Sequence, residues 1–461
     1  MEHNENQPMQ NQEAPSYFER LMTSLRNSVM LKMLVVAFLV LLLLIPTGMI
    51  INLIEERKEL NEFVTEEVSS KWAGEQTLAG PILTIPVIEK KLKSNREDEG
   101  PVYKYTTKYL QVLPQNLRIN GEVVPNKLSR GIYEAIVYES NIQISGDFSF
   151  EPKEDLGNYD SIDYQNAFLT IGISDLRGVE ERIVINWNGT ESKVRPGSRI
   201  REIIESGVSA NVNAEELKNK NVSFGLDLKL KGSSDLSFIP SGGETVVKMK
   251  SSWPSPKFGG IIIPDNRNVT SDGFSATWKT LEINRNFPQS WFGDEYSDAF
   301  NRSSFGLSLL NPADQYQNTL RAAKYAILTI TLTFLIFFLS EAIKGQKIHP
   351  FQYILVGFAL CLFYALLIAL SEHMPFDTAY LSASVAIISM IFFYSLKVFQ
   401  SKRFAFVVLG LLVALYGFLY VTLKLEDYAL LMGTCGLAII LALTMYFTRN
   451  INWYRLSSST T

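Results

Sequence analysis

Long apolar runs near the two ends of the chain constrain its fold more than any other feature of the sequence. The hydrocarbon core of a bilayer is about 30 Å thick, so a helix needs about 20 apolar residues to cross it. Residues 33–54 qualify, and five further runs follow at approximately 325–343, 351–370, 379–396, 404–423 and 428–447. The sequence predicts six transmembrane helices: one N-terminal anchor and a five-helix C-terminal bundle over 325–447.

The first run is interpreted as a retained anchor rather than a cleaved signal peptide. Its helix breakers are Pro46 and Gly48, which membrane helices tolerate. It is longer than the roughly 7–15 apolar residues of a signal peptide, and no small-residue cleavage site follows it.

The positions of Lys and Arg predict the orientation, because these residues are enriched in cytoplasmic segments beside the spans. If the N-terminus is cytoplasmic, ten lie inside: Arg20, Arg26, Lys32, Lys344, Lys347, Lys397, Lys402, Arg403, Arg449 and Arg455. Five lie outside near the spans: Arg57, Lys58, Arg321, Lys324 and Lys424. Both termini are therefore predicted to be cytoplasmic, and residues 55–320 are predicted to be periplasmic.

Two cytoplasmic tails are expected, at 1–32 and 448–461. Residues 1–16 are polar and are predicted to be disordered. Residues 17–32 suit either an amphipathic helix on the inner leaflet or a simple extension of the first span.

The composition of residues 55–320 excludes several classes of function. This region holds 38 Asp+Glu and 30 Lys+Arg, a net charge of −8, and the chain has no basic stripe, so nucleic acid is not an expected partner. The region contains neither Cys nor His, which excludes a disulfide framework, a Ser-His-Asp triad and a His-based zinc site within it. The chain also lacks the usual ATPase, metalloprotease and serine hydrolase motifs. We expect no enzyme activity, no metal and no cofactor.

The same region predicts a mainly antiparallel β sandwich. Apolar residues four apart, from Leu60 to Trp72, first extend the helix to about Gly74. Alternation of apolar and polar residues then begins, most clearly over 222–230, with frequent Gly, Pro and Asn turns. The sequon Asn188-Gly189-Thr190 is interpreted as a turn. The length allows one large sandwich or two smaller ones.

Ionisable residues at membrane depth are often functional. Four candidates lie near the ends of predicted spans: Glu341, His349, Glu372 and His373. The alternative is that they are helix-end residues in interfacial water. Two acidic clusters in the β-rich region are interpreted as solvated loops rather than as catalytic pairs: Asp160 with Asp163, and Asp294 with Glu295 and Asp298.

Glu372 and His373 close one predicted span before a loop of about five residues. Neighbours on a helix point about 100° apart, so one side chain can face the bundle. We hypothesise that His373 helps to dock the β-rich domain or a ligand, with a carboxylate partner. The candidate partners are Glu372 of a neighbouring subunit, Glu426 and Asp427.

Ordered segments through most of the chain resemble the CreD family of inner-membrane proteins of Gram-negative bacteria. They include the segments beginning at Leu78 (LAGPILTIPV), Arg130 (RGIYEA), Gly172 (GISDLRG), Ser252 (SWPSP), Gly273 (GFSATW), Lys324 (KY), Phe337 (FFLSE), His349 (HPFQY), Ser371 (SEH), Asp427 (DYALLMG) and Thr448 (TRNINWY). The resemblance covers about 31–454. Family members often have His where Ser255 stands, which weakens any role for a His there.

The resemblance implies an inner-membrane location and a part in cell-envelope integrity, but no established reaction or catalytic residues. The leading hypothesis is a non-enzymatic protein that contacts the lipid bilayer and binds an envelope component or envelope protein. One alternative is a transporter or flippase-like protein with a polar path through the bundle. Another is a membrane enzyme acting on envelope carbohydrate or lipid.

Overall fold

The computed structural model describes residues 29–96, 100–150, 159–309, 315–344, 348–399, 401–425 and 428–449. The chain forms two compact units: a β unit, Asn61–Pro312, and a helical unit from the chain before and after it. A β-rich domain therefore lies between the first helix and the later helices, as the sequence predicts. The expected tails, including the segment 17–32, lie almost wholly outside the described residues.

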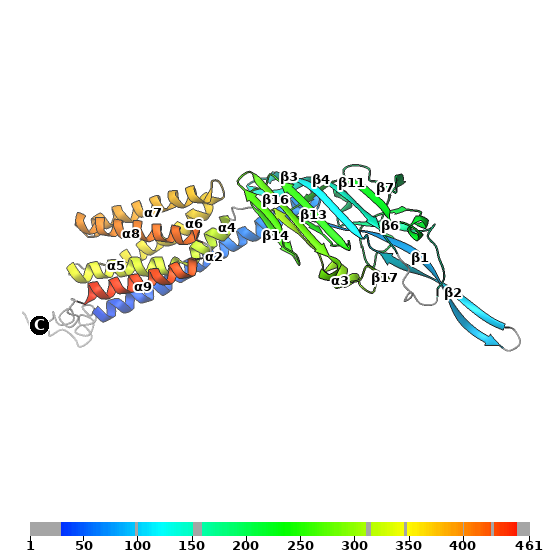
Figure 1. Cartoon of the computed structure of the whole chain (residues 1–461). Helices are drawn as coiled ribbons and strands as arrows, with labels where there is room; N and C mark the ends of the chain where they lie inside the picture. Colours follow the sequence, from blue (N-terminus) through cyan, green and yellow to red (C-terminus); the bar gives the residue numbers. More distant parts are fainter. Residues whose placement is uncertain are drawn as a thin grey trace, which may run out of the picture. The chain divides into compact units, whose positions relative to one another are not determined.

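The helical unit contains the first part of α2 (Val29–Trp72), followed after the β unit by α4 (Gln315–Lys324), α5 (Ala326–Lys344), α6 (Pro350–Ser371), α7 (Phe376–Val398), α8 (Lys402–Lys424) and α9 (Ala429–Thr448) (Figure 1). In the described part of the chain, α2, α6, α7 and α8 are long and apolar enough to cross a membrane. The α4–α5 pair, bent by 42°, makes a fifth crossing when it is counted as one span. Helix α9 coincides with the last predicted run, and the six-span count stays a prediction.

The β-rich region is shorter at its C-terminal end than predicted. The predicted limit is residue 320, which lies within helix α4. Tyr316, Thr319 and Ala322 of α4 are buried, and the helix packs against α6 and α8. The β unit therefore ends earlier, at Pro312.

Helix α2 is much longer than a membrane crossing requires. It has 44 residues, with Pro46 inside it. At 1.5 Å per residue it is about 66 Å long, about twice the thickness of the hydrocarbon core. Its end at Trp72 confirms the prediction that the helix continues to about Gly74.

The β unit consists of two sheets, mainly antiparallel as predicted. The first has ten strands: β14 (Pro256–Gly260), β18 (Phe305–Leu309), β12 (Asp235–Phe238), β1 (Gln76–Arg96), β6 (Phe168–Ile173), β10 (Gly207–Asn211) and β9 (Arg195–Pro196) in order, with β2 (Gly100–Val112), β5 (Tyr159–Ile162) and β17 (Ser290–Phe292) beside them. The second has eight: β15 (Asn266–Thr270), β16 (Gly273–Leu281), β13 (Glu244–Ser251), β3 (Asn116–Arg130), β4 (Tyr133–Phe148), β11 (Val222–Ser233), β7 (Val184–Trp187) and β8 (Thr190–Lys193). Among the named pairs, β1–β12 and β13–β3 are parallel.

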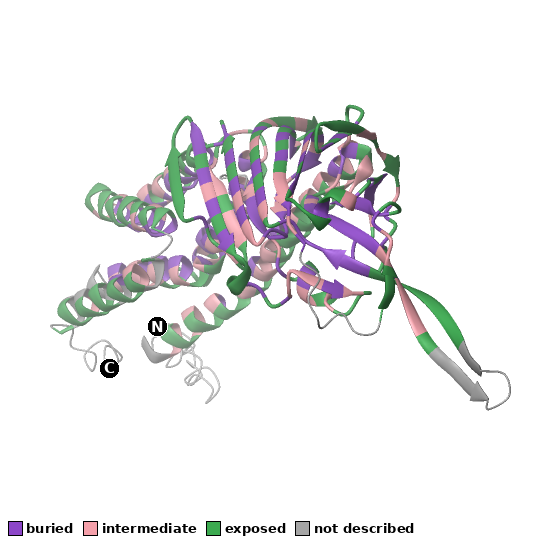
Figure 2. Cartoon of the chain, turned by 45° about the vertical axis from the view of Figure 1, so that its right-hand side comes forward, coloured by how far each residue is buried: buried purple, intermediate pink, exposed green. Residues whose placement is uncertain are grey.

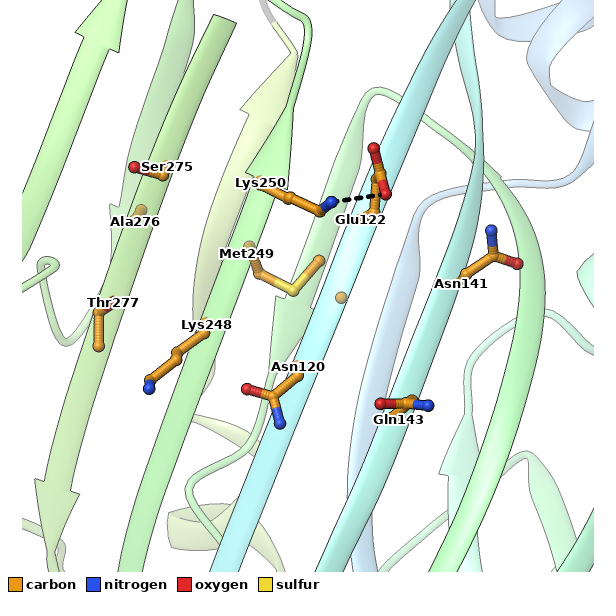
Figure 3. A pocket seen from close by; sticks show the side chains of 11 residues that line it. Asn120, Glu122, Asn141, Gln143, Lys248, Met249, Lys250, Ser275, Ala276 and Thr277 are labelled. Atoms are coloured by element: carbon orange, nitrogen blue, oxygen red, sulfur yellow. Dashed lines mark ion pairs between the residues drawn. The ribbon is translucent and has the colours of Figure 1, made fainter.

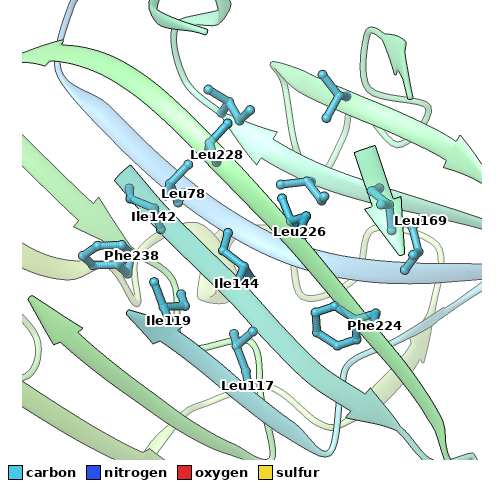
Figure 4. Packing of buried hydrophobic residues seen from close by; sticks show 14 of the residues in the cluster. Leu78, Leu117, Ile119, Ile142, Ile144, Leu169, Phe224, Leu226, Leu228 and Phe238 are labelled. Carbon is cyan, nitrogen blue, oxygen red and sulfur yellow. The ribbon is translucent and has the colours of Figure 1, made fainter. Parts of the chain in front are cut away.

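One hydrophobic core joins the two sheets. Leu78 and Leu169 from the ten-stranded sheet pack in one cluster with Leu117, Ile144 and Leu226 from the eight-stranded sheet (Figure 4). The structure therefore resolves the open alternative in favour of one large sandwich, and the region Asn61–Pro312 is a single compact unit.

The burial pattern explains why these segments form strands. Along β11, buried residues such as Leu226 and Leu228 alternate with exposed ones, and Figure 2 shows the same alternation in neighbouring strands. Asn188 and Gly189 join β7 to β8, with φ of 50° and 82°. Two positive φ values suit a tight hairpin turn and favour Asn-Gly, so the predicted turn at the sequon is confirmed.

The segment after β6 fixes the end of α2 to the sheet. Asp175 accepts a hydrogen bond from Gly74 N (2.9 Å) and pairs with the guanidinium of Arg177 (2.6 Å). Arg177 also donates to Ser70 O, in the last turn of α2 (2.8 Å). The hydrogen bonds that the Asp175 carboxylate accepts, above all those from the Arg177 side chain, lower the pKa of Asp175 to about 2. The fully buried Gln76 donates to Asp175 O (2.9 Å).

Candidate functional site

Glu341 lies near the end of α5, where three helices of the helical unit meet. Its side chain is 8% exposed, and its Oε1 is 2.6 Å from Nζ of Lys32 on α2. Tyr353 on α6 donates a hydrogen bond to its other carboxylate oxygen (3.2 Å). A buried carboxylate is costly unless it is paired and hydrogen-bonded, so this cluster ties α2, α5 and α6 together.

His349 has an identifiable local role as the N-cap of α6. Its Nδ1 accepts a hydrogen bond from Phe351 N (3.2 Å), and the Gln352 side chain accepts one from His349 N (3.0 Å). Pro350 follows at the first helical position, where its missing N–H costs nothing. The imidazole is exposed and is engaged with its own helix.

Glu372 and His373 lie at the opposite end of α6. The Glu372 side chain is 12% exposed, with Oε1 4.0 Å from Nε of Arg57 on α2. The exposed His373 directs Nδ1 at the Ala369 carbonyl (3.1 Å). Two of the hypothesised partners of His373, Glu426 and Asp427, lie outside the described residues.

The four predicted residues therefore form two separate clusters. Helix α6 has 22 residues, so its ends are about 33 Å apart. Glu341 and His349 lie near its start, whereas Glu372 and His373 follow its end. The sequence predicts no functional role for Lys32, which it places in the cytoplasmic tail before the first span, or for Tyr353. No local pattern could have indicated these two residues, because they meet Glu341 only in the folded helical unit.

Buried hydroxyl groups occupy the helices between these clusters. Tyr364 on α6 donates to Thr329 Oγ1 on α5 (3.2 Å), and Tyr380 on α7 donates to the Tyr416 carbonyl on α8 (2.8 Å). The Tyr416 hydroxyl is buried without a hydrogen-bond partner in the described part of the chain. These groups form a polar component within an otherwise apolar unit.

In the β unit, a shallow groove of about 480 Å³ lies on the outer face of the eight-stranded sheet (Figure 3). Strand pairing places its polar side chains in two parallel rows across β16, β13, β3 and β4. The rows are Thr277, Lys248, Asn120 and Gln143, and next to it Ser275, Lys250, Glu122 and Asn141.

The groove carries both hydrogen-bond donors and acceptors. Lys250 and Glu122 form an ion pair across neighbouring strands (2.9 Å), and amides and hydroxyls supply most of the other polar groups. Each amide offers a carbonyl acceptor and two N–H donors, so closely spaced amides can engage neighbouring hydroxyl groups of one ligand. This chemistry suits a ligand rich in hydroxyl and acetamido groups.

The acidic clusters in the β unit have local partners. Asp163 accepts hydrogen bonds from the backbone and side chain of Asn166, and Asp160 is 3.9 Å from the Lys90 ammonium. Asp298 pairs with Arg302 (3.6 Å). Within the described residues, no group of three or more His, Cys, Asp or Glu side chains is arranged to hold a metal ion.

The apolar helices and the inserted sandwich define a multi-pass membrane protein with a large β domain. A family model described as "Inner membrane protein CreD" matches residues 28–454. The chain belongs to the CreD family of inner membrane proteins, and the resemblance noted in the sequence is therefore confirmed. It is 34% identical to inner membrane protein CreD of Escherichia coli K12 over 427 residues, which cover 91% of this chain and 92% of that protein.

The similarity of this chain to solved structures is too low to indicate an activity. An M1 zinc metallopeptidase from Deinococcus radiodurans aligns with 75% of this chain and 92% of its own at 8% identity and a TM-score of 0.20. A two-domain M1 zinc metallopeptidase aligns with 46% of this chain and 53% of its own, also at 8% identity and a TM-score of 0.20.

Proposed function

We propose that this protein supports cell-envelope integrity without catalysis, by binding an envelope component through its β unit. The groove on the eight-stranded sheet is the proposed site, and an N-acetylated amino-sugar glycan is the proposed ligand class. The observation that carries the proposal is the pair of in-register polar rows across four adjacent strands. The rows present many donors and acceptors on a rigid sheet, which lowers the ordering cost of binding.

The proposal includes an orientation with both termini in the cytoplasm and the β unit in the periplasm, where envelope glycans occur. The ten-to-five asymmetry of Lys and Arg supports this orientation. Family membership supports the inner membrane as the location.

Binding of soluble cell-wall glycan fragments to the full chain in lipid nanodiscs tests the proposal. The variant N120A/Q143A removes two amides from one row, and each lost hydrogen bond costs about 1 kcal/mol, so the total loss of about 2 kcal/mol should lower the affinity roughly 30-fold. The control N219A/N221A removes two amides from the loop before β11 and should bind as the unchanged protein does. Glycan binding that is absent, or equal in both variants, would refute the groove as the site.

A polar path through the helical unit is the second candidate function. The buried hydroxyls of Tyr364, Tyr380 and Tyr416, between the clusters around Glu341 and Glu372, favour it. Neutral substitutions at Glu341, Glu372 and His373 separate the two functions in a complementation assay. Loss of function in a folded variant with intact glycan binding would favour the path.

A further inference from the structure

Strands β1 and β2 extend beyond the sandwich as a two-stranded ribbon, here called the arm, formed by residues 90–96 and 100–105 (Figures 1 and 2). Strand β5 pairs with β1 only as far as Glu89, and β17 pairs with β2 only at Leu110–Val112. In the described residues, the arm's strands pair with each other alone. An isolated two-stranded ribbon is marginally stable in water, so its side chains must stabilise it or engage a partner.

The arm has two chemically different faces. Tyr103 and Tyr105 of the arm and Tyr109 at its base are spaced by even numbers of residues and share one face; their exposed fractions are 42%, 56% and 48%. The Tyr109 ring lies 6.4 Å from the Phe168 ring of β6. Lys90, opposite Tyr105, shares this face; its Nζ lies 4.2 Å from the centroid of the Tyr103 ring and 3.9 Å from the Asp160 carboxylate.

Charged residues occupy the other face. Glu89 pairs there with Lys108 (3.2 Å) and with Lys91 (3.3 Å), and Lys104 is exposed opposite Lys91. These ion pairs stabilise the ribbon from this side, whereas the rings of Tyr103 and Tyr105 on the opposite face stay about half exposed.

The size of the tyrosine face argues against a folded protein as its occupant. A buried aromatic side chain contributes about 150–250 Å², so three half-exposed rings offer roughly 300 Å². A stable protein interface buries about 800 Å² on each partner. The arm therefore fits a narrow chain molecule better than a globular partner or a second copy of this chain.

The spacing of the tyrosine rings and the charge of this segment indicate which class of chain molecule it binds. At about 3.4 Å per residue, Tyr103 and Tyr105 are about 7 Å apart and Tyr109 lies about 14 Å further on, so the rings form a row about 20 Å long. Tyrosine offers a flat apolar face with a hydroxyl at its edge, which matches the apolar face and polar rim of a sugar ring. Residues 89–109 have a net charge of +2, within a region of net charge −8.

We infer that the tyrosine face of the arm is a second binding site, which stacks against an extended glycan chain bearing acidic substituents. Tyr103, Tyr105 and Tyr109 hold the sugar rings, and Lys90 attracts the carboxylates. The inference rests on the proposed function for its ligand class, whereas the residues involved are separate from the groove.

The test uses the full chain in nanodiscs and two probes of matched length: uncrosslinked cell-wall glycan strands, which carry carboxylates, and neutral N-acetylglucosamine oligomers. The variant Y103S/Y105S should weaken binding of both probes at least about fivefold, as loss of an aromatic anchor typically does. K90Q should weaken binding of the acidic strands alone and reduce its salt dependence. The control V269S changes an equally exposed residue of β15 and should change neither.

Nitration of Tyr103 and Tyr105 gives a measurement that needs no variant: acidic strands should protect both rings in the unchanged protein. Normal affinity in Y103S/Y105S, or unprotected rings, overturns the inference even if N120A/Q143A loses binding and the groove proposal stands. Weaker binding in Y103S/Y105S with unchanged N120A/Q143A supports the arm and refutes the groove. Binding of neither probe refutes both.

Discussion

Asp175 shows how one residue can couple two elements of the fold. It connects Gly74, just after α2, with Arg177, which in turn binds the last turn of that helix. The resemblance pointed to this segment without giving it a role. The structure supplies one, because the same carboxylate satisfies a backbone N–H and a guanidinium.

Replacing Asp175 by Asn should lower the free energy of unfolding by about 1–2 kcal/mol at pH 7. The pKa of Asp175 is about 2 in the folded protein and about 3.9 in an unfolded chain. Its stabilisation is therefore fully present above about pH 4 and is lost as the pH falls towards 2. Urea unfolding between pH 2 and pH 7 should show the gap to D175N closing at low pH. The control D227N, at an exposed position of β11, should show no such gap; a pH-independent gap for D175N would contradict the mechanism.

The Lys32–Glu341 pair gives a second prediction at the same scale. K32M leaves the Glu341 carboxylate with Tyr353 alone and should cost about 1–2 kcal/mol, less than a fully buried pair because Lys32 is partly exposed. K32M/E341Q should recover much of the loss. Thermal unfolding in detergent measures both, with K397M as an exposed-lysine control. Equal losses in K32M and K32M/E341Q would show that the charge pair is not the cause.

At the scale of elements, sequence pattern predicts most of what is local. The alternation of apolar and polar residues predicts β11, and the apolar residues spaced four apart predict where α2 ends. The bend between α4 and α5 has no such signal, because neither Pro nor Gly occurs where it falls. The meeting of Lys32 with Glu341, 309 residues apart, depends on packing that no local pattern records.

Gly178, in the segment after β6, packs closely against the backbone of β11. A Cβ there would overlap Lys231 O of β11 and lie 2.6 Å from the side-chain amide nitrogen of Gln76. G178A should destabilise the β unit by about 1–3 kcal/mol, the usual cost of overpacking. The control G259A, in β14, meets nothing within 4 Å. Tryptophan fluorescence during thermal unfolding would compare them, and equal melting temperatures would show that the backbone relaxes there.

At the scale of the whole molecule, the sequence predicted the order of the parts and the family. It did not show that the four candidate residues form two separate clusters, because the order of residues along the chain does not reveal which side chains meet. It also gave no sign of the groove, whose side chains come from four strands that meet only after folding.

The orientation is directly testable. Fusions to periplasmic and cytoplasmic reporter enzymes, ending at Gly242 and at the C-terminus, should be active in the periplasm and in the cytoplasm, respectively. The reason is the bias of Lys and Arg towards the inner side. A cytoplasmic Gly242 or an exported C-terminus would contradict the six-span orientation.

The position of β1 has a consequence for biogenesis. This first strand pairs with β12, joining Gln76 to Leu236, and β12 in turn pairs with β18 near the end of the β unit. At about 5–20 residues synthesised per second, roughly 10–30 s separate β1 from β12. During that time the first residues of β1, Gln76–Leu78, lack their parallel neighbour, and such long-range pairing forms slowly. The nascent β unit should therefore depend on chaperones that shield unpaired strands until β18 emerges.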